Sequence, residues 1–148
     1  MRTSVIQNII LATLIIVFLY TGCAKLLNFE AYKETITQSP ILKPYAGVVV
    51  WMTPCVEFLI AFMLMNRKSR LIGFSAAFIV MILFTIYIVA LHYFTDYIAC
   101  SCGGIFESLP PGLHILLNIC LTGIALAGVI LNRGKRLQIF AGRSYQKA

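Results

Sequence analysis

The sequence is poor in charge. Charged residues make up 11% of the 148 residues, and only five of them are acidic. A soluble domain of ordinary composition carries about 25% charged residues, because its surface has to be hydrated. With 60% hydrophobic residues, this chain has more apolar surface than a soluble globular protein of its size could bury in its core. The composition therefore excludes an ordinary soluble protein and predicts one transmembrane domain over residues 1–148.

The scarcity of acidic residues leaves a formal net charge of +7. The basic residues stand beside the apolar runs and form no separate basic module, so no nucleic-acid partner is expected. Anionic lipid headgroups are the expected counter-charge, and the lipid bilayer is the first predicted partner.

Four apolar runs are long enough, or nearly so, to cross a bilayer core about 30 Å thick, which takes about 20 helical residues. None shows the alternating pattern of a barrel strand, so we expect helices, which satisfy their own backbone hydrogen bonds in lipid. The predicted fold class is an all-α membrane protein, a four-transmembrane-helix bundle. The predicted spans are residues 5–22, 45–65, 71–94 and 114–131.

The loop between the last two spans lacks basic residues altogether. Residues 95–113 contain no Lys or Arg, whereas Arg67, Lys68 and Arg70 crowd the preceding loop and residues 132–148 form a basic tail. Short loops rich in Lys and Arg stay in the cytoplasm. We therefore predict that both termini are cytoplasmic and that the first and third loops lie outside.

The first outer loop has a helical apolar pattern. Phe29, Tyr32 and Ile36 recur at spacings of three and four, Asn28 is suited to the N-cap position, and Pro40 follows the segment. We predict a short amphipathic helix that lies at the interface or folds back over the bundle mouth. An ordinary connecting loop is the alternative.

Small residues four apart let helices approach closely in lipid. Gly73 with Ala77, and Gly123 with Ala127, form two such pairs.

A different hypothesis concerns the N-terminus, where an apolar run before Thr21-Gly22-Cys23 resembles a lipoprotein cleavage site. Cleavage there would leave Cys23 as a lipidated N-terminus.

The loop without basic residues carries the sequence Cys100-Ser101-Cys102-Gly103-Gly104. On the oxidising side of a membrane, paired cysteines tend to form disulfides. Two cysteines separated by one residue close a very small ring, and strain makes such a bond easier to reduce. The two glycines supply the freedom of a tight turn. The pattern therefore favours a redox-active disulfide formed by Cys100 and Cys102.

Other interpretations of this cysteine pair stay open. Either cysteine could form a structural cross-link with Cys23, or both could bind copper(I) or zinc together with His92 or His114, which flank the loop. Each histidine could instead present a polar tip at the membrane interface. Inert thiols are the remaining alternative. Cys55 and Cys120 lie within spans, where buried thiols behave as small hydrophobes, and they are left out of the predicted site.

Glu57 is the one acid inside a predicted span, three residues after Pro54. A carboxyl group in hydrocarbon has to be neutral, paired or turned toward the bundle interior. We predict a polar pocket of Glu57, Lys25 and Asn118 that holds a proton relay or a quinone-sized cavity. The alternative is a structural hydrogen bond of Glu57 across helices. Lys25 could equally extend outward to the headgroups.

Several of these motifs resemble a known family. Thr21-Gly22-Cys23-Ala24-Lys25-Leu26, the segment at Phe29, and Pro54-Cys55-Val56-Glu57 resemble the DoxX-like superfamily of four-helix membrane proteins. The Cys-x-Cys-Gly loop before the last span resembles the MauE-like branch, which is linked to methylamine utilisation. The resemblance implies a bacterial inner-membrane protein associated with periplasmic thiol or disulfide chemistry, with Cys100 and Cys102 as its cysteine pair.

Two functional hypotheses follow. In the first, the Cys100–Cys102 pair is the catalytic element of a thiol-disulfide oxidoreductase that exchanges electrons with a periplasmic thiol protein and passes them to quinone. In the second, the chain is a non-catalytic accessory or assembly subunit of a larger membrane or envelope complex, and the disulfide only shapes a surface. A transporter or metal carrier is a weaker third hypothesis, because the spans contain a single acid.

Overall fold

A computed structural model of the chain describes residues 2–94 and 111–145. Within these residues all regular secondary structure is helical, and short turns connect the helices. The elements are α1 (Arg2–Leu27), α2 (Phe29–Gln38), the 3₁₀ turn η1 (Lys43–Tyr45), α3 (Ala46–Met65), α4 (Arg70–Phe94) and α5 (Pro111–Tyr145).

Four helices, α1, α3, α4 and α5, are long and apolar enough to cross a membrane, and this confirms the predicted fold class. Their apolar stretches are Val5–Leu27, Lys43–Met65, Arg70–Tyr93 and Gly112–Gly134. Two helices run further than the apolar runs suggest. α1 continues through Lys25 to Leu27, and α5 continues beyond the predicted last span, through its basic residues, to Tyr145.

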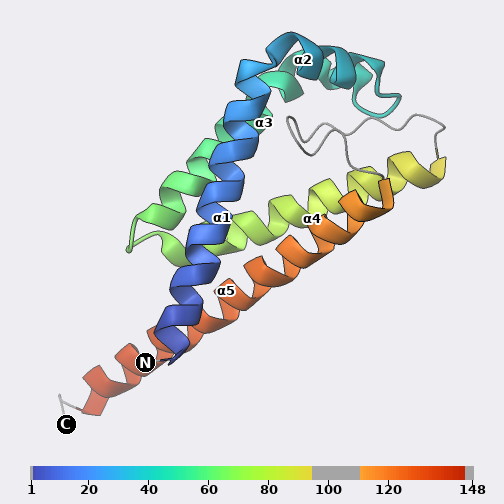
Figure 1. The fold of residues 1–148 in the computed structure, drawn as a ribbon. Helices are drawn as coiled ribbons and strands as arrows, with labels where there is room; N and C mark the ends of the chain where they lie inside the picture. Colours follow the sequence, from blue (N-terminus) through green and yellow to red (C-terminus); the bar gives the residue numbers. More distant parts are fainter. Residues whose placement is uncertain (1, 95–110, 146–148) are drawn as a thin grey trace.

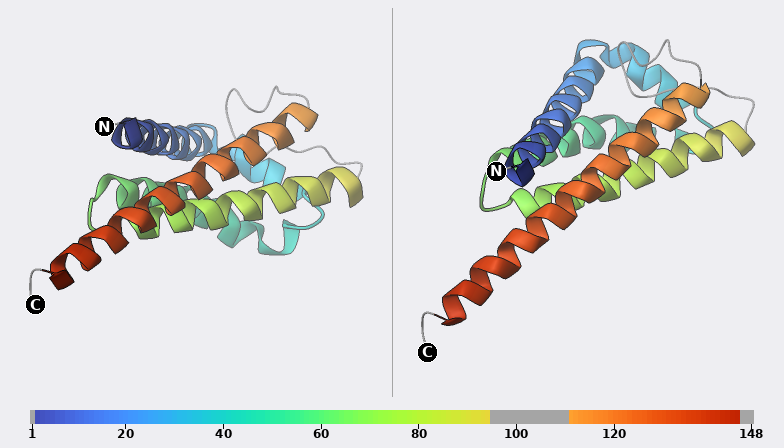
Figure 2. Two further views of the ribbon diagram at one scale, coloured as in Figure 1. Left: turned by 90° about the horizontal axis from the view of Figure 1, so that it is seen from below. Right: turned by 60° about the horizontal axis from the view of Figure 1, so that its bottom comes forward.

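The helices lie in two pairs that diverge from one end of the bundle to the other (Figure 1). α1 packs mainly against α3, and α4 mainly against α5, while α3 and α4 connect the pairs. The start of α1, the α3–α4 turn and the C-terminal half of α5 lie at the end where the pairs meet, which we call the closed end. The opposite end, which carries α2, is called the open end. α5 extends past the other helices at the closed end (Figure 2).

At the closed end, glycines of one helix pack against large side chains or the backbone of a neighbouring helix. A Cβ atom on Gly128 would lie 2.4 Å from the ring of Phe74, and one on Gly73 would lie 2.9 Å from the backbone of Leu64. Phe74 and Leu64 are completely buried. These glycines therefore let α5 approach α4, and α4 approach α3, more closely than a side chain would permit.

The prediction from small-residue pairs was right for one pair and wrong for the other. Gly73 and Ala77 are both buried at the closed end. Gly123 is exposed, and nothing lies within 4 Å of the place where its Cβ would be. The side of α5 that packs instead carries Leu121, Ala125 and Gly128, because positions three and four apart share a helix face.

The amphipathic helix predicted in the first loop is present as α2. Tyr32 and Ile36 are buried against Ala46 and Val50 of α3, so α2 folds back onto the bundle at the open end. Asn28 occupies the N-cap position as predicted, although its side chain makes no capping hydrogen bond.

Candidate site at the open end

The site begins where α1 comes close to α3. A Cβ atom on Gly22 would lie 3.2 Å from the ring of Phe58, a contact tighter than usual for a side chain. Lys25 lies one turn beyond Gly22 on the same side of α1, and Glu57 precedes Phe58 on α3. The glycine therefore allows the approach that brings these two charged side chains together.

Lys25 and Glu57 form a buried ion pair. Lys25 Nζ donates a hydrogen bond to Glu57 Oε1 at 2.5 Å, and the two side chains are 3% and 2% exposed. Lys25 therefore turns into the bundle and does not extend outward. Two opposite charges in contact satisfy the requirement that a charge inside a membrane be paired. As a unit, the pair carries no net charge.

Two aromatic rings also flank the Lys25 ammonium group. Nζ lies 5.8 Å from the centre of the Tyr32 ring on α2 and 5.6 Å from the centre of the Phe84 ring on α4. A cation within about 6 Å of a ring is attracted to the negative face of the π-system. Lys25 thus contacts side chains from α2, α3 and α4.

A small cavity, which we call the polar cavity, lies on one side of the ion pair. Its volume is about 30 Å³, which is about the share of one molecule in liquid water. Within the described chain, Glu57 Oε2 is buried without a hydrogen-bond partner. Thr21 lines the same cavity, but its hydroxyl donates to Val17 O.

His114 and Asn118 bring α5 to the polar cavity. Both side chains are buried, and Asn118 Nδ2 donates to the backbone oxygen of His114 at 3.2 Å. The structure thus places Glu57, Lys25 and Asn118 around one cavity. Among the described residues, the bond that joins two of these three side chains is the one from Lys25 to Glu57.

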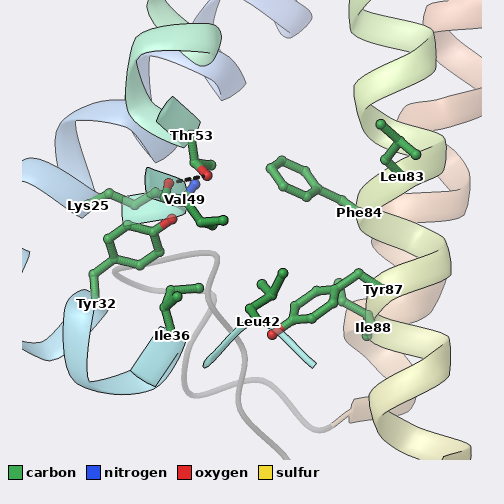
Figure 3. Close-up of a pocket in the computed structure, with 10 residues that line it drawn as sticks. All are labelled: Lys25, Tyr32, Ile36, Leu42, Val49, Thr53, Leu83, Phe84, Tyr87 and Ile88. Carbon is green, nitrogen blue, oxygen red and sulfur yellow. Dashed lines mark hydrogen bonds between the residues drawn. The ribbon is translucent and has the colours of Figure 1, made fainter. Parts of the chain in front are cut away.

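A second cavity of about 230 Å³, which we call the aromatic cavity, is also lined by Lys25. Figure 3 shows side chains from α1, α2 and α3 facing those from α4 across it. Thr53 Oγ1 donates to Val49 O at its edge, and Tyr87 OH donates to Ser39 Oγ at 2.9 Å. The cavity is lined by Lys25, Tyr32, Ile36, Leu42, Val49, Thr53, Leu83, Phe84, Tyr87 and Ile88.

The predicted cysteine pair, Cys100 and Cys102, lies outside the described residues. Cys23 is a free and exposed thiol, and the alternative cross-link to it involves the same two cysteines outside the described residues. The expectation that Cys55 and Cys120 are buried was wrong, because both are exposed. Both thiols are on the outside of the bundle, where a membrane protein meets lipid.

The two histidines of the metal hypothesis have different surroundings. His92 is exposed near the end of α4 and contacts Tyr93 edge to face. His114 is buried beside the polar cavity. Within residues 2–94 and 111–145, no three His, Cys, Asp or Glu side chains are grouped so that they could hold a metal ion.

Sequence reasoning named Lys25, Tyr32 and Ile36 but missed the residues of α4 that line the aromatic cavity. Phe84 and Tyr87 belong to an apolar run in which aromatic residues are unremarkable, so only the meeting of α4 with α1 and α2 reveals their role. Ser39 could have been noticed in the sequence, because it is a polar residue directly before Pro40. In the structure its side chain is completely buried.

A family model described as methylamine utilisation protein MauE matches residues 3–131. The match covers α1 to α4 and most of the apolar part of α5. No curated protein and no solved structure matches the chain.

Proposed function

This chain belongs to the MauE family of membrane proteins, and from that premise we propose that it carries out thiol-disulfide exchange at the outer face of the bacterial inner membrane. Cys100 and Cys102 are the proposed reactive pair. A periplasmic protein with two thiols is the proposed electron donor, and quinone dissolved in the bilayer is the proposed acceptor.

The observation that carries the proposal is the arrangement of the open end. α4 ends there at Phe94 and α5 begins there at Pro111, and Cys100 and Cys102 lie between these two residues in the sequence. The open end also has the buried Lys25–Glu57 pair and the aromatic cavity. A cavity among the helix ends that flank a cysteine pair in the sequence supports the proposal of electron transfer between a water-soluble thiol and a lipid-soluble oxidant.

The proposed reaction proceeds in two halves. A donor thiolate attacks the Cys100–Cys102 disulfide, forms a mixed disulfide with one cysteine and releases the other as a thiolate. The second donor thiolate then cleaves the mixed disulfide, which leaves the donor oxidised and the Cys100–Cys102 pair reduced. Reoxidation of the pair releases two electrons and two protons, and quinone takes up both to become quinol.

The test replaces single cysteines in intact cells. We expect Cys100→Ser and Cys102→Ser each to abolish oxidation of the donor and one of them to accumulate a mixed disulfide, visible as a reductant-sensitive band on a gel. Cys55→Ser and Cys120→Ser are matched controls on the outer surface of the bundle and should retain full function. A membrane-impermeant thiol reagent should label Cys100 and Cys102 from outside once the pair is reduced.

Full function of the Cys100→Ser/Cys102→Ser double variant would refute the redox function. An accessory role would then be supported if purification in mild detergent gave a stoichiometric partner complex that is indifferent to reductant. Labelling only from the cytoplasmic side would refute the proposed orientation and the periplasmic donor together.

A further inference from the structure

The aromatic cavity has the size and wall chemistry of a ligand site. Sites for small molecules are concave and mostly apolar, with a few polar groups that orient the ligand. Here most of the lining side chains are apolar or aromatic, and Ile36, Leu42, Val49 and Ile88 are among them. A volume of about 230 Å³ lies below the range of about 300–1,000 Å³ typical of sites for drug-sized molecules. The cavity therefore suits a single ring with small substituents.

The charges at the cavity indicate an uncharged ligand that accepts hydrogen bonds. Lys25 lines the cavity, but Glu57 already neutralises it. An ammonium group has three N–H donors. Across the described residues, the one hydrogen bond that the Lys25 side chain donates is the bond to Glu57. Donors thus remain for a neutral acceptor such as a carbonyl oxygen, whereas a second anion would compete with Glu57.

The walls also indicate the shape of the ligand. Tyr32 and Phe84 place their rings on either side of Lys25 Nζ, and the ring of Tyr87 lines the same cavity (Figure 3). Aromatic rings pack well against another planar ring in offset or edge-to-face geometry. Leu83, at the edge of the cavity, is 58% exposed on the outside of α4. A long apolar tail attached to the ring would leave the cavity there and enter the lipid.

We propose that the aromatic cavity binds the head group of a membrane quinone, with Lys25 donating a hydrogen bond to one of its carbonyl oxygens. The inference rests on the proposed function, because it assigns the site of the electron acceptor named there. During reduction, negative charge develops on the carbonyl oxygens, and the Lys25 ammonium stabilises that charge. The two electrons and two protons come from the cysteine pair, so quinone becomes quinol as the dithiol becomes a disulfide.

The distance to the cysteine segment is compatible with this assignment. Tyr87 lines the cavity and Phe94 ends α4 seven residues later. At 1.5 Å per residue, the helix covers about 10 Å between them. α4 thus ends about two helical turns beyond the cavity, and Cys100 and Cys102 follow Phe94 by six and eight residues in the sequence.

The experiment measures binding of a decyl-substituted benzoquinone to the purified full-length protein in lipid nanodiscs. Two substitutions of equal size at adjacent positions give a matched pair. Val49 lines the cavity, whereas Val48 is 61% exposed and does not line it. We expect Val49→Phe to weaken quinone binding at least tenfold and Val48→Phe to leave it within about twofold.

A second variant tests the hydrogen-bond donor. Lys25→Met/Glu57→Leu removes both charges together, so neither is left buried alone. We expect about a tenfold loss of quinone affinity, the size of effect associated with one hydrogen bond from a charged group. A circular dichroism melt of each variant checks that it is folded. If Val49→Phe is unfolded, Ile88→Phe, which fills the cavity from α4, takes its place.

The outcomes separate the site from the proposed function. If the wild-type protein binds no quinone, or if Val48→Phe and Val49→Phe lose affinity equally, the site assignment is overturned, whereas mixed-disulfide trapping still decides the thiol function. If Cys100→Ser/Cys102→Ser binds quinone with wild-type affinity, as we expect, the site stands independently of the cysteines. Full donor oxidation by that same variant would refute the function and leave the quinone site in place.

Discussion

The closed end and the open end of this bundle are built from the same four helices but differ in what separates them. At the closed end, Gly73 and Gly128 leave room for Leu64 and Phe74, and the helices meet in apolar contact. At the open end, an ion pair and bulky aromatic rings stand between the helices and leave two cavities. Small residues thus close one end, and large or charged residues hold the other end open.

The difference matters because apolar packing between helices in lipid gains little from the hydrophobic effect. Lipid tails are as apolar as leucine, so close contact and hydrogen bonds carry the association. The closed end depends on close contact. The open end is joined instead by the Lys25–Glu57 pair, by the Tyr87–Ser39 hydrogen bond and by α2, which packs through Tyr32 and Ile36.

The largest expected effect comes from breaking the ion pair. Lys25→Met leaves the Glu57 carboxylate buried without its partner and should lower the free energy of unfolding by about 3–5 kcal/mol. Lys25→Met/Glu57→Leu removes both charges and should be within about 1 kcal/mol of the wild-type protein, because a buried pair adds little net stability. Denaturant unfolding in detergent micelles measures both. Equal losses in the single and double variants would show that the charge pair is not the cause.

The next effect concerns α2. Ile36 is 1% exposed, so Ile36→Ala should cost about 2–4 kcal/mol through lost contacts and the cavity left behind. Ile41, which is 42% exposed, is the control, and Ile41→Ala should cost less than about 0.5 kcal/mol. Proteolysis of the first loop, compared between the two variants, would report whether α2 has detached. Equal cleavage would contradict the packing of α2 on α3.

A smaller effect is expected at the closed end. Gly128→Ala drives a methyl group into the buried ring of Phe74 and should cost about 1–3 kcal/mol. Gly123→Ala meets nothing within 4 Å and should be neutral or stabilise the helix by up to about 1 kcal/mol. Thermal melts followed by circular dichroism would show opposite shifts. Identical melting temperatures would mean that α4 and α5 do not depend on this close approach.

The smallest effect tests the link between α4 and the turn after α2. Tyr87→Phe removes the hydroxyl that donates to Ser39 and should cost about 0.5–1.5 kcal/mol. Tyr93→Phe changes an exposed ring near the end of the same helix and should have no measurable effect on unfolding. If both variants unfold like the wild-type protein, the Tyr87–Ser39 bond does not stabilise the open end.

Much of the fold could be predicted from the residues. The lengths of the apolar runs predicted four spans, and the spacing of Phe29, Tyr32 and Ile36 predicted α2. The candidate site was predicted only in outline. Glu57 had to be paired or turned inward, because an isolated charge is expensive in hydrocarbon. That rule alone left both Lys25 and Asn118 as partners, and only the structure shows which of them bonds to Glu57.

The remaining errors share one cause. A single apolar run shows which residues are in the membrane but not which face of the helix meets another helix. Gly123, Cys55 and Cys120 were therefore misjudged, because each lies on a face that no other part of the described chain covers. Gly128 was missed for the same reason.

By itself, the sequence determined that this chain is a bundle of membrane-spanning helices, since length, hydropathy and local spacing are properties of each segment alone. Only the tertiary structure decided that Lys25 turns inward to Glu57, and that Phe84 and Tyr87 face α1 and α2 across a cavity. Those contacts join residues that are distant along the chain. They depend on how closely the helices approach and at what rotation, and no local pattern specifies either quantity.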